Sequence, residues 1–359
     1  MNNKILFIAL QYAHDNYLSN HKSELSKHAN VESLTVDDKS KFISKIYRRR
    51  GFLSMPFELL YFFSYLIKEK PTHVLTVGPK LGLLLSLVCF FFPKIRHGHW
   101  FTGQVWGATK KYKRSVAYWC DVIITNLSND IFSDGLSQRE FLKDKIKIKK
   151  EIYTPKYGSV NGISDKFFSN DDTQLSASSD TLNVCYIGRK AKGKGLERIP
   201  SIARALEQRG IDVRFILAGP KDISFPDYED WKEKNCSGIK SIQFIDDFVN
   251  PAEIFRQSQV LILPSDREGF GSVVIEAQAC GLIVLCSDIY GLRDAFVDGV
   301  TGFSCQNNDI TSYVDSIIKL TNYEVLNDMR FNALSFSLNF KSDNFKKDLF
   351  FCYKEAGYI

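Results

Sequence analysis

Short apolar runs alternate with longer amphipathic stretches along most of the chain. Glycine, proline or polar residues bound these runs, which is typical of strands buried in a parallel sheet. In the first half we expect strands at residues 5–10, 73–77, 95–100 and 122–125, and helices at 17–28, 55–68, 81–91 and 115–120. In the second half we expect strands at 182–187, 213–218, 242–244, 260–263 and 283–286, and helices at 195–209, 251–257 and 272–280. This alternation predicts an α/β protein with doubly wound parallel sheets.

A polar segment without periodicity interrupts the alternation at residues 169–180. The chain has 359 residues, which is longer than one ordinary core supports. We therefore expect two Rossmann-like domains, residues 1–168 and 181–338, joined by a linker at 169–180. Two domains facing a cleft fit this pattern better than one extended sheet, and ligands of such sheets bind beyond the carboxyl ends of the strands.

The composition is that of an ordinary globular protein, with 44% hydrophobic and 25% charged residues. The longest largely apolar stretch, residues 81–92, is well short of the roughly 20 residues that span a bilayer. Residues 4–10 could imitate a signal peptide, but residues 11–15 offer a poor cleavage site, so a first strand is the better interpretation. The eight cysteines form no C-x-x-C pair, which favours free thiols in a reducing compartment over disulfides or zinc. We expect a cytoplasmic protein, or one peripheral on the inner face of the cell membrane.

Positive charge is concentrated in the first half of the chain. Residues 1–165 contain 25 Lys and Arg against 14 Asp and Glu, a difference of +11, whereas the remainder contributes −5 to the total of +6. Nucleic acid is one anionic partner that such a half could bind. However, Arg48–Arg50 precede the apolar and aromatic residues 52–67, which suits an anionic membrane surface better. The alternative is an exposed charge run beside a buried helix.

Two glutamates in the second half mark a candidate ligand site. Glu268 lies in a glycine-flanked loop between an expected strand and an expected helix, and Glu276 lies one to two turns along that helix. Glycines let a ligand approach the backbone, and the first turn of a helix favours anionic or hydroxyl-rich groups. The loop after the strand at 182–187 adds cations at Arg189 and Lys194, which can hold a diphosphate.

These motifs resemble those of the retaining family 4 glycosyltransferases, which have the GT-B fold. The resemblance includes Glu268–Glu276, residues 277–281, 291–294 and 298–303, and the Gly188-Arg189 and Lys194-Gly195 element. It is specific from about residue 184 to 303, and the family members concerned build bacterial surface polysaccharides. It implies two Rossmann-like domains with a C-terminal helix, residues 339–359, crossing back to the first domain. The plain alternative is a nucleotide-free Rossmann-like domain whose glycines only form turns.

The resemblance also implies roles for individual residues. Glu268 would accept hydrogen bonds from the donor sugar, near the backbone N–H groups of Phe270 and Gly271, and Glu276 would accept them from the ribose. Arg189 and Lys194 would neutralise the diphosphate, and His99, at the end of an expected strand, would face the donor sugar as a catalytic residue. The implied donor-binding set is Gly188, Arg189, Lys194, Glu268, Gly269, Phe270, Gly271, Ser272 and Glu276.

Other residues receive plainer interpretations. We expect solvated charges at Lys190 and Lys192, which match no fixed family position. Residues 157–164 resemble the segment that ends the first domain, and we expect a turn there. His97 and His99 have metal-ligand spacing on a strand, but no third ligand is obvious. No Asp-x-Asp triplet occurs, which fits a metal-independent enzyme.

The sequence therefore predicts retaining transfer of a sugar from a nucleotide donor, with UDP the first choice, to a glycan acceptor linked to a lipid diphosphate. No separate cofactor and no nucleic-acid partner are expected. Two departures from the family pattern limit the inference: residues 11–17 lack the usual Gly-Gly turn, and Asp246-Asp247 replace a usual glycine near the base site. The alternatives are a nucleotide-sugar epimerase of the same fold and a non-catalytic sugar-nucleotide-binding subunit. A hydrolase would need both carboxylates at one scissile bond, which the resemblance does not imply.

Overall fold

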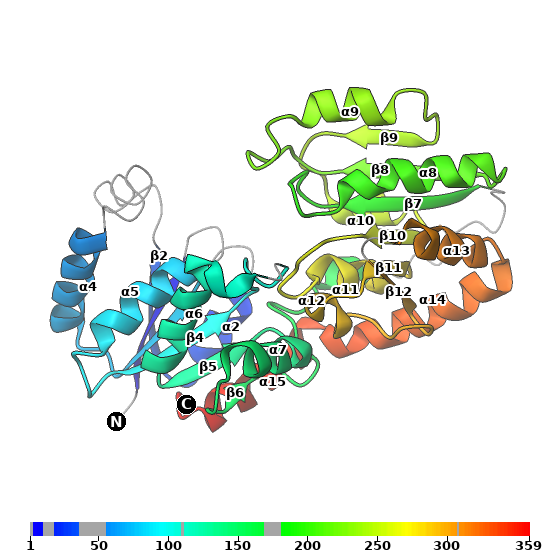
Figure 1. Cartoon of the computed structure of the whole chain (residues 1–359). Helices are drawn as coiled ribbons and strands as arrows, with labels where there is room; N and C mark the ends of the chain where they lie inside the picture. The colour runs from blue at the N-terminus through cyan, green and yellow to red at the C-terminus, as the bar shows by residue number, and fades with distance from the viewer. Residues whose placement is uncertain (1–2, 10–17, 36–54, 109–110, 169–180, 307–308) are drawn as a thin grey trace. The chain divides into compact units, whose positions relative to one another are not determined.

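The computed structural model describes residues 3–9, 18–35, 55–108, 111–168, 181–306 and 309–359 (Figure 1). The chain forms two compact units. The first comprises Met1–Gly162 together with Ser342–Ile359, and the second comprises Ile163–Lys341. The linker expected at 169–180, the residues after the first strand and Arg48–Arg50 lie outside the described residues.

The first unit is built on a parallel sheet of six strands in the order β2-β1-β3-β4-β5-β6. The strands are β1 (Lys4–Ala9), β2 (Asn30–Thr35), β3 (His73–Val77), β4 (Arg96–Phe101), β5 (Asp130–Ser133) and β6 (Ile152–Tyr153). Alternate residues of β1 serve opposite faces: Phe7 belongs to one apolar cluster, and Leu6 and Ile8 belong to the other. Both faces are therefore buried, which explains why this strand is a continuous apolar run.

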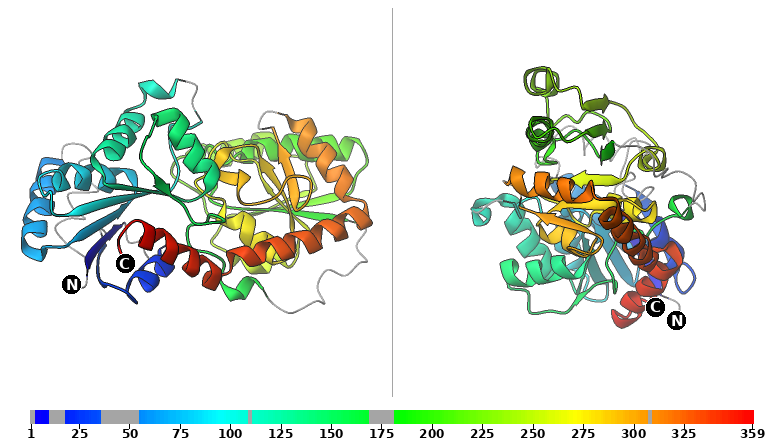
Figure 2. Two further views of the ribbon diagram at one scale, coloured as in Figure 1. Left: turned by 90° about the horizontal axis from the view of Figure 1, so that it is seen from below. Right: turned by 90° about the vertical axis from the view of Figure 1, so that its right-hand side faces the viewer.

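Helices cover both faces of this sheet. One face is packed by α2 (Ser19–Leu25) and α15 (Ser342–Glu355), which lie side by side in Figure 2 (blue and red). The other face is packed by α4 (Met55–Glu69) and α5 (Pro79–Cys89). Next along that layer are α6 (Val116–Leu127) and, farther on, α7 (Leu136–Ile146), which pack on β4, β5 and β6.

The strand expected at 122–125 is wrong, because these residues continue α6. The β-branched run resembles a strand locally, but the buried positions Tyr118, Asp121 and Ile124 recur at helical spacing. The strand that follows is instead β5, which is short and bounded by aspartates, so its apolar signal is weak.

The second unit has a parallel sheet in the order β12-β11-β10-β7-β8-β9. The strands are β7 (Leu182–Ile187), β8 (Val213–Ala218), β9 (Ile242–Ile245), β10 (Val260–Leu263), β11 (Ile283–Ser287) and β12 (Gly302–Cys305). The α-helices are α8 (Ile199–Gln208), α9 (Tyr228–Cys236), α10 (Pro251–Phe255), α11 (Ser272–Ala279), α12 (Tyr290–Arg293), α13 (Ile310–Leu320) and α14 (Tyr323–Ser337). The 3₁₀ turns include η3 (Asp165–Phe167), η4 (Leu196–Arg198) and η5 (Leu338–Phe340).

Residues 163–168, which we expected to end the first domain, belong to the second unit. Ile163 donates its N–H to the carbonyl of Phe340 at 2.7 Å, and Phe167 packs on Phe255 with ring centroids 6.2 Å apart. The thiol of Cys280 also donates to the carbonyl of Phe167. These contacts fix the segment to the second unit before the expected linker begins.

The order of the second sheet has one reversal, and it lies between β7 and β10. From β7 the chain proceeds through β8 and β9 on one side, and then through β10, β11 and β12 on the other. In an open parallel sheet, the loops at the carboxyl ends of the strands on either side of such a reversal diverge and leave room for a ligand. The loops after β7 and β10 carry the residues that the sequence singled out.

The described residues contain neither a helix that could span a membrane nor a disulfide. None of the helices in the described ranges is long and apolar enough to cross a bilayer. All eight cysteines are free, and five of them are buried.

Candidate functional site

An ion pair joins the two loops at the reversal of the second sheet. Nζ of Lys194, in the loop after β7, lies 2.7 and 2.8 Å from the two carboxylate oxygens of Glu268, in the loop after β10. The hydroxyl of Ser265 donates to Oε1 of Glu268 at 2.8 Å. The structure therefore brings together a cation and a carboxylate that are 74 residues apart in sequence. Ser265 is an addition that the sequence reasoning missed, although its position two residues after the end of β10 could have indicated it.

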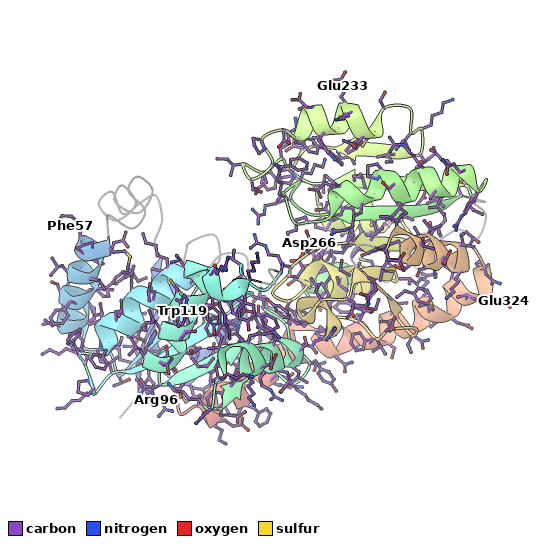
Figure 3. The ribbon with its side chains drawn as sticks, viewed as in Figure 1. Phe57, Arg96, Trp119, Glu233, Asp266 and Glu324 are labelled. Atoms are coloured by element: carbon purple, nitrogen blue, oxygen red, sulfur yellow. The ribbon has the colours of Figure 1, made fainter. Side chains whose placement is uncertain are left out.

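Close backbone contacts hold these loops in register. Gly195 has φ of +71°, and a Cβ there would lie 1.7 Å from the carbonyl oxygen of Pro264. A Cβ on Gly291 would lie 2.1 Å from the carbonyl oxygen of Glu268. Arg198, also not anticipated, donates to the carbonyl of Pro264 at 2.7 Å and pairs with Asp266, which Figure 3 labels. Only glycine fits at these two positions, because the neighbouring backbone occupies the space of a side chain.

The backbone N–H groups of the glycine turn before α11 mostly donate hydrogen bonds to carbonyls within the protein. The N–H of Gly271 donates to the carbonyl of Gly291 at 3.2 Å, and that of Ser272 donates to the carbonyl of Phe270 at 2.7 Å. The ring of Phe270 is buried and packs on Phe340 with centroids 5.9 Å apart. The N–H of Gly271, which the resemblance assigned to the donor sugar, is thus already engaged, and the Phe270 side chain has a packing role.

Glu276 lies on α11 in a half-buried position. Burial raises the pKa of its carboxyl to about 7, and the positive charge of Lys166 opposes that shift. Within the described ranges, no side chain donates a hydrogen bond to Glu276. A carboxyl in this condition has hydrogen-bonding capacity left for a ligand.

Arg189 follows the same strand as Lys194 but extends further into solvent. Its guanidinium pairs with Asp222. Lys192 is also exposed, as expected, and pairs with Asp227 at 3.1 Å. The cations of this loop therefore have carboxylate partners, which an anionic ligand would have to replace.

Comparison with known proteins decides the family. The model of the glycosyl transferases group 1 family matches residues 168–334. Residues 168–334, nearly half of the chain, therefore carry a group 1 glycosyl transferase domain. The capsular polysaccharide biosynthesis glycosyltransferase CapM of Staphylococcus aureus is 27% identical over 270 residues, which cover 72% of this chain and 70% of CapM.

Solved structures confirm the GT-B fold of this glycosyltransferase. Sucrose-phosphate synthase from Thermosynechococcus elongatus has a TM-score of 0.78 at 16% identity, with 99% of each chain covered. HepE from Anabaena, solved in complex with UDP and glucose, has a TM-score of 0.71 at 14% identity, with 99% of this chain and 100% of HepE covered. The two six-stranded parallel sheets with flanking helices agree with this fold.

The expectation that Lys190 is solvated is wrong. Its side chain is fully buried and pairs with Asp246, and Nζ also donates to the carbonyl of Ile245 at 2.9 Å. Rings of Phe244 and Tyr228 lie 5.6 and 5.7 Å from Nζ. Sequence reasoning missed this pair because its members follow β7 and β9, which are not adjacent in the sheet.

Asp246 is the centre of a partly buried cluster that includes Lys190. Burial acts to raise the pKa of Asp246, but hydrogen bonds from Lys190, Lys232 and Tyr228 outweigh it and lower the pKa to about 2. The bonds from Lys232 and Tyr228 are both 2.9 Å long. The carboxylate of Asp246, which lies where the family usually has a glycine, therefore accepts hydrogen bonds from residues of its own unit. This cluster holds the loops after β7 and β9 together.

His99 lies inside the first unit. It is fully buried on β4, and its Nδ1 is 2.9 Å from the hydroxyl of Thr76, which also lies 3.0 Å from Nε2 of His97. Burial, with a contribution from His97, lowers the pKa of His99 to about 3, so the ring is neutral at physiological pH. A Cβ on Gly82 of α5 would lie 2.3 Å from the ring. This environment is that of a packed core histidine.

The segment 157–164 forms the expected turn, with positive φ at Gly158, Ser159 and Gly162. Asn161 binds the start of α2: its Oδ1 accepts from the N–H of Asn20 at 3.0 Å. The border between the two units falls at Gly162. Within the described ranges, no group of three or more His, Cys, Asp or Glu residues is arranged to hold a metal ion.

Proposed function

We propose that this glycosyltransferase moves a sugar from a UDP-sugar to a surface glycan with retention of anomeric configuration. The observation that carries the proposal is the Lys194–Glu268 pair at the reversal of the second sheet. A cation at this point can bind the donor diphosphate, and the adjacent carboxylate can accept hydrogen bonds from sugar hydroxyls. HepE, a protein with this fold solved with UDP and glucose, supports UDP as the first nucleotide to test.

The proposed reaction breaks one bond at the anomeric carbon and forms another. The bond from C1 of the donor sugar to the β-phosphate oxygen breaks, and C1 bonds to the acceptor hydroxyl oxygen. The acceptor proton passes to the departing phosphate oxygen on the same face, so no enzymic nucleophile is required. Arg189 and Lys194 would stabilise the charge that grows on the diphosphate, because preformed cations act most strongly where charge develops.

The acceptor in this proposal is a growing oligosaccharide carried on a lipid diphosphate. CapM, the relative that aligns over 72% of this chain, is named for capsular polysaccharide biosynthesis, which supports a surface glycan. The basic first half of the chain supports an anionic carrier. An acceptor screen with membrane extracts and a panel of nucleotide sugars tests this part of the proposal.

Lys194→Met and Glu268→Gln separate binding from turnover. Loss of the cation should weaken UDP binding by about 10- to 100-fold, because a charge-assisted hydrogen bond is lost. Glu268→Gln should keep or strengthen UDP binding, because it removes the carboxylate that competes for Lys194, and should lower kcat by roughly 100-fold or more, because the proposed role of Glu268 is at the sugar. Calorimetry with UDP and an initial-rate assay measure the two effects. Lys192→Met and Glu197→Gln, at exposed positions nearby, are the matched controls.

Near-normal transfer by both variants would contradict this assignment of the site. A parallel incubation with UDP-sugar and no acceptor tests the epimerase alternative, since a new UDP-hexose would then form. UDP binding without either product would indicate a non-catalytic subunit.

A further inference from the structure

Helix α4 of the first unit turns much of its apolar surface outward. Phe57, Leu60 and Ile67 are 62%, 67% and 52% exposed, and Phe63 lies between them on the same stripe. Figure 3 labels Phe57, whose side chain projects from the end of α4 away from its unit. The sequence alternative of a buried helix therefore does not hold for this face. Contiguous exposed apolar surface of this kind marks an interaction site in a globular protein.

Both acidic residues of α4 are paired with lysines. Glu58 is buried and pairs with Lys80 at 2.8 Å, and Glu69 pairs with Lys4 at 3.1 Å and with the exposed Lys68 at 3.7 Å. Lys68 is the one charged residue among the exposed positions of α4. The exposed positions of α4 itself therefore combine large apolar side chains with one cation, and both carboxylates of this helix have lysine partners.

The end of α5 extends the same surface. Phe90 and Phe91 are both exposed, and the ring of Phe63 lies 6.5 Å from that of Phe91 and 4.9 Å from that of Phe92. Lys94, two residues farther on, is exposed. We call Phe57, Leu60, Phe63, Ile67, Phe90 and Phe91 the α4 face.

Helix α6, in the same layer, repeats this combination. Val116, Trp119 and Ile123 form an exposed stripe at helical spacing. Exposed basic residues precede the stripe at Lys111, Lys113 and Arg114. The indole N–H of Trp119 donates to the carbonyl of Lys113 at 3.0 Å, which joins the two parts.

We infer that the α4 face is a docking surface for a bilayer that contains anionic lipids. Phenylalanine, leucine and isoleucine side chains can enter the boundary between headgroups and acyl chains, while Lys68 and Lys94 remain among the headgroups. Each lysine close to an anionic surface adds attraction, and the pairing of Glu58 and Glu69 with internal lysines removes the opposing repulsion. This charge complementarity favours an anionic bilayer over a second copy of the chain, whose α4 face would carry the same cations.

This inference goes beyond the proposed function and can be tested separately from it. Vesicle binding depends on the first unit, whereas UDP binding is assigned to loops of the second unit. UDP affinity therefore reports on the donor site and on folding, and it should be the same in every variant made on the α4 face.

The test is co-sedimentation of the full chain with vesicles of phosphatidylcholine, alone or with phosphatidylglycerol. A triple variant, Phe57→Ser, Leu60→Gln and Phe91→Ser, removes the two most exposed large apolar side chains of α4 and one that follows α5. Its matched control is Ile223→Gln, Tyr323→Ser and Phe331→Ser, since these second-unit side chains are 95%, 59% and 62% exposed. A charge variant, Lys68→Gln with Lys94→Gln, is compared with Lys234→Gln and Lys240→Gln, which are also exposed.

We expect the wild type to bind vesicles that contain phosphatidylglycerol more tightly than neutral vesicles. The apolar triple variant should lose at least about thirtyfold in the partition constant, because three side chains no longer enter the interface. The charge variant should lose about fivefold to thirtyfold, and only on the anionic vesicles. Both control variants should bind as the wild type does.

Three results would overturn the inference. They are absence of wild-type binding to either vesicle, unchanged binding by the triple variant, and equal loss in the triple variant and its control. A concentration-dependent dimer that the triple variant converts to monomer, without vesicle binding, would assign the face to a second copy instead.

Discussion

The close approach of Gly195 to Pro264 permits a sharp test of how the site is held together. In a Gly195→Ala variant, the new Cβ would lie 1.7 Å from the Pro264 carbonyl oxygen, whereas ordinary van der Waals contact begins at 3.4 Å. The two backbones must therefore separate by up to 3.4 − 1.7 = 1.7 Å. Lys194 is the adjacent residue, so its ammonium should move away from Glu268 by a similar distance. A misplacement of about 1 Å can lower turnover roughly 100-fold.

Gly193→Ala is the matched control for this variant. Gly193 has φ of +82°, close to the +71° of Gly195, but a Cβ there meets nothing within 4 Å. Both variants incur the cost of an L-residue at positive φ, about 1 to 2 kcal/mol. Gly195→Ala adds the clash, so its loss in unfolding free energy should exceed about 3 kcal/mol, in the range of overpacked sites.

Urea unfolding and initial-rate kinetics on both variants measure these differences. We expect Gly193→Ala to retain transfer within about threefold of wild type, because the strain is local, and Gly195→Ala to lose at least about 100-fold in kcat/KM. Equal stability and equal turnover in the two variants would refute the reasoning, because the contact with Pro264 would then have no part in holding Lys194 against Glu268.

Three further variants test the buried polar groups. The pKa of Glu276 in the folded protein is about 7, above the ordinary 4.5. Its contribution to the stability of the fold is therefore greatest at low pH and is lost as the pH rises through 7. Glu276→Gln should raise the free energy of unfolding at pH 8 by about 1 to 2 kcal/mol and weaken UDP binding about tenfold. Unchanged pH dependence of unfolding would contradict the shift. Asp246→Ala leaves the buried Lys190 charge with the Ile245 carbonyl alone and should cost about 3 kcal/mol in urea unfolding, whereas Asp247→Ala, at an exposed position, should cost under about 0.5. His99→Gln should lower stability by about 1 to 2 kcal/mol and leave kcat of the folded fraction unchanged; a large fall in kcat at normal stability would instead support the catalytic role that the resemblance implied.

Most of the strands that could be predicted are buried on both faces, although β9 is only partly buried. A strand such as β7 or β10 must then be apolar throughout, and the polar loops on either side define its ends. The error at α6 has the same origin: Val122–Thr125 is apolar and β-branched, and only burial at helical spacing distinguishes it from a strand. Local composition shows which segments are buried, but it distinguishes a buried strand from a buried helix less well.

Some residues of the candidate site could also be predicted from local sequence, and others could not. Glu268 and Lys194 were found because glycines and a strand end mark each of them locally. Lys190 was misjudged because its burial depends on Asp246, 56 residues later, and on rings from Tyr228 and Phe244. A lysine that follows two other charged or glycine positions in a loop has no local signature of burial. Only the order of β7, β8 and β9 in the sheet brings these residues together.

The cations of the candidate site are paired with carboxylates, which bears on the proposed binding of a donor. Lys194 is paired with Glu268 and Arg189 with Asp222, so under the proposed function a donor diphosphate would have to replace carboxylates that already satisfy both cations. The net gain in binding is then smaller than two new charge pairs would give, because the old pairs are lost. The displaced Glu268 carboxylate, which accepts a hydrogen bond from Ser265, would then be available to the hydroxyls of the proposed donor sugar. We therefore expect the affinity for UDP alone to be lower than the affinity for a ligand that presents a diphosphate and a sugar together, because only the latter also engages the displaced carboxylate.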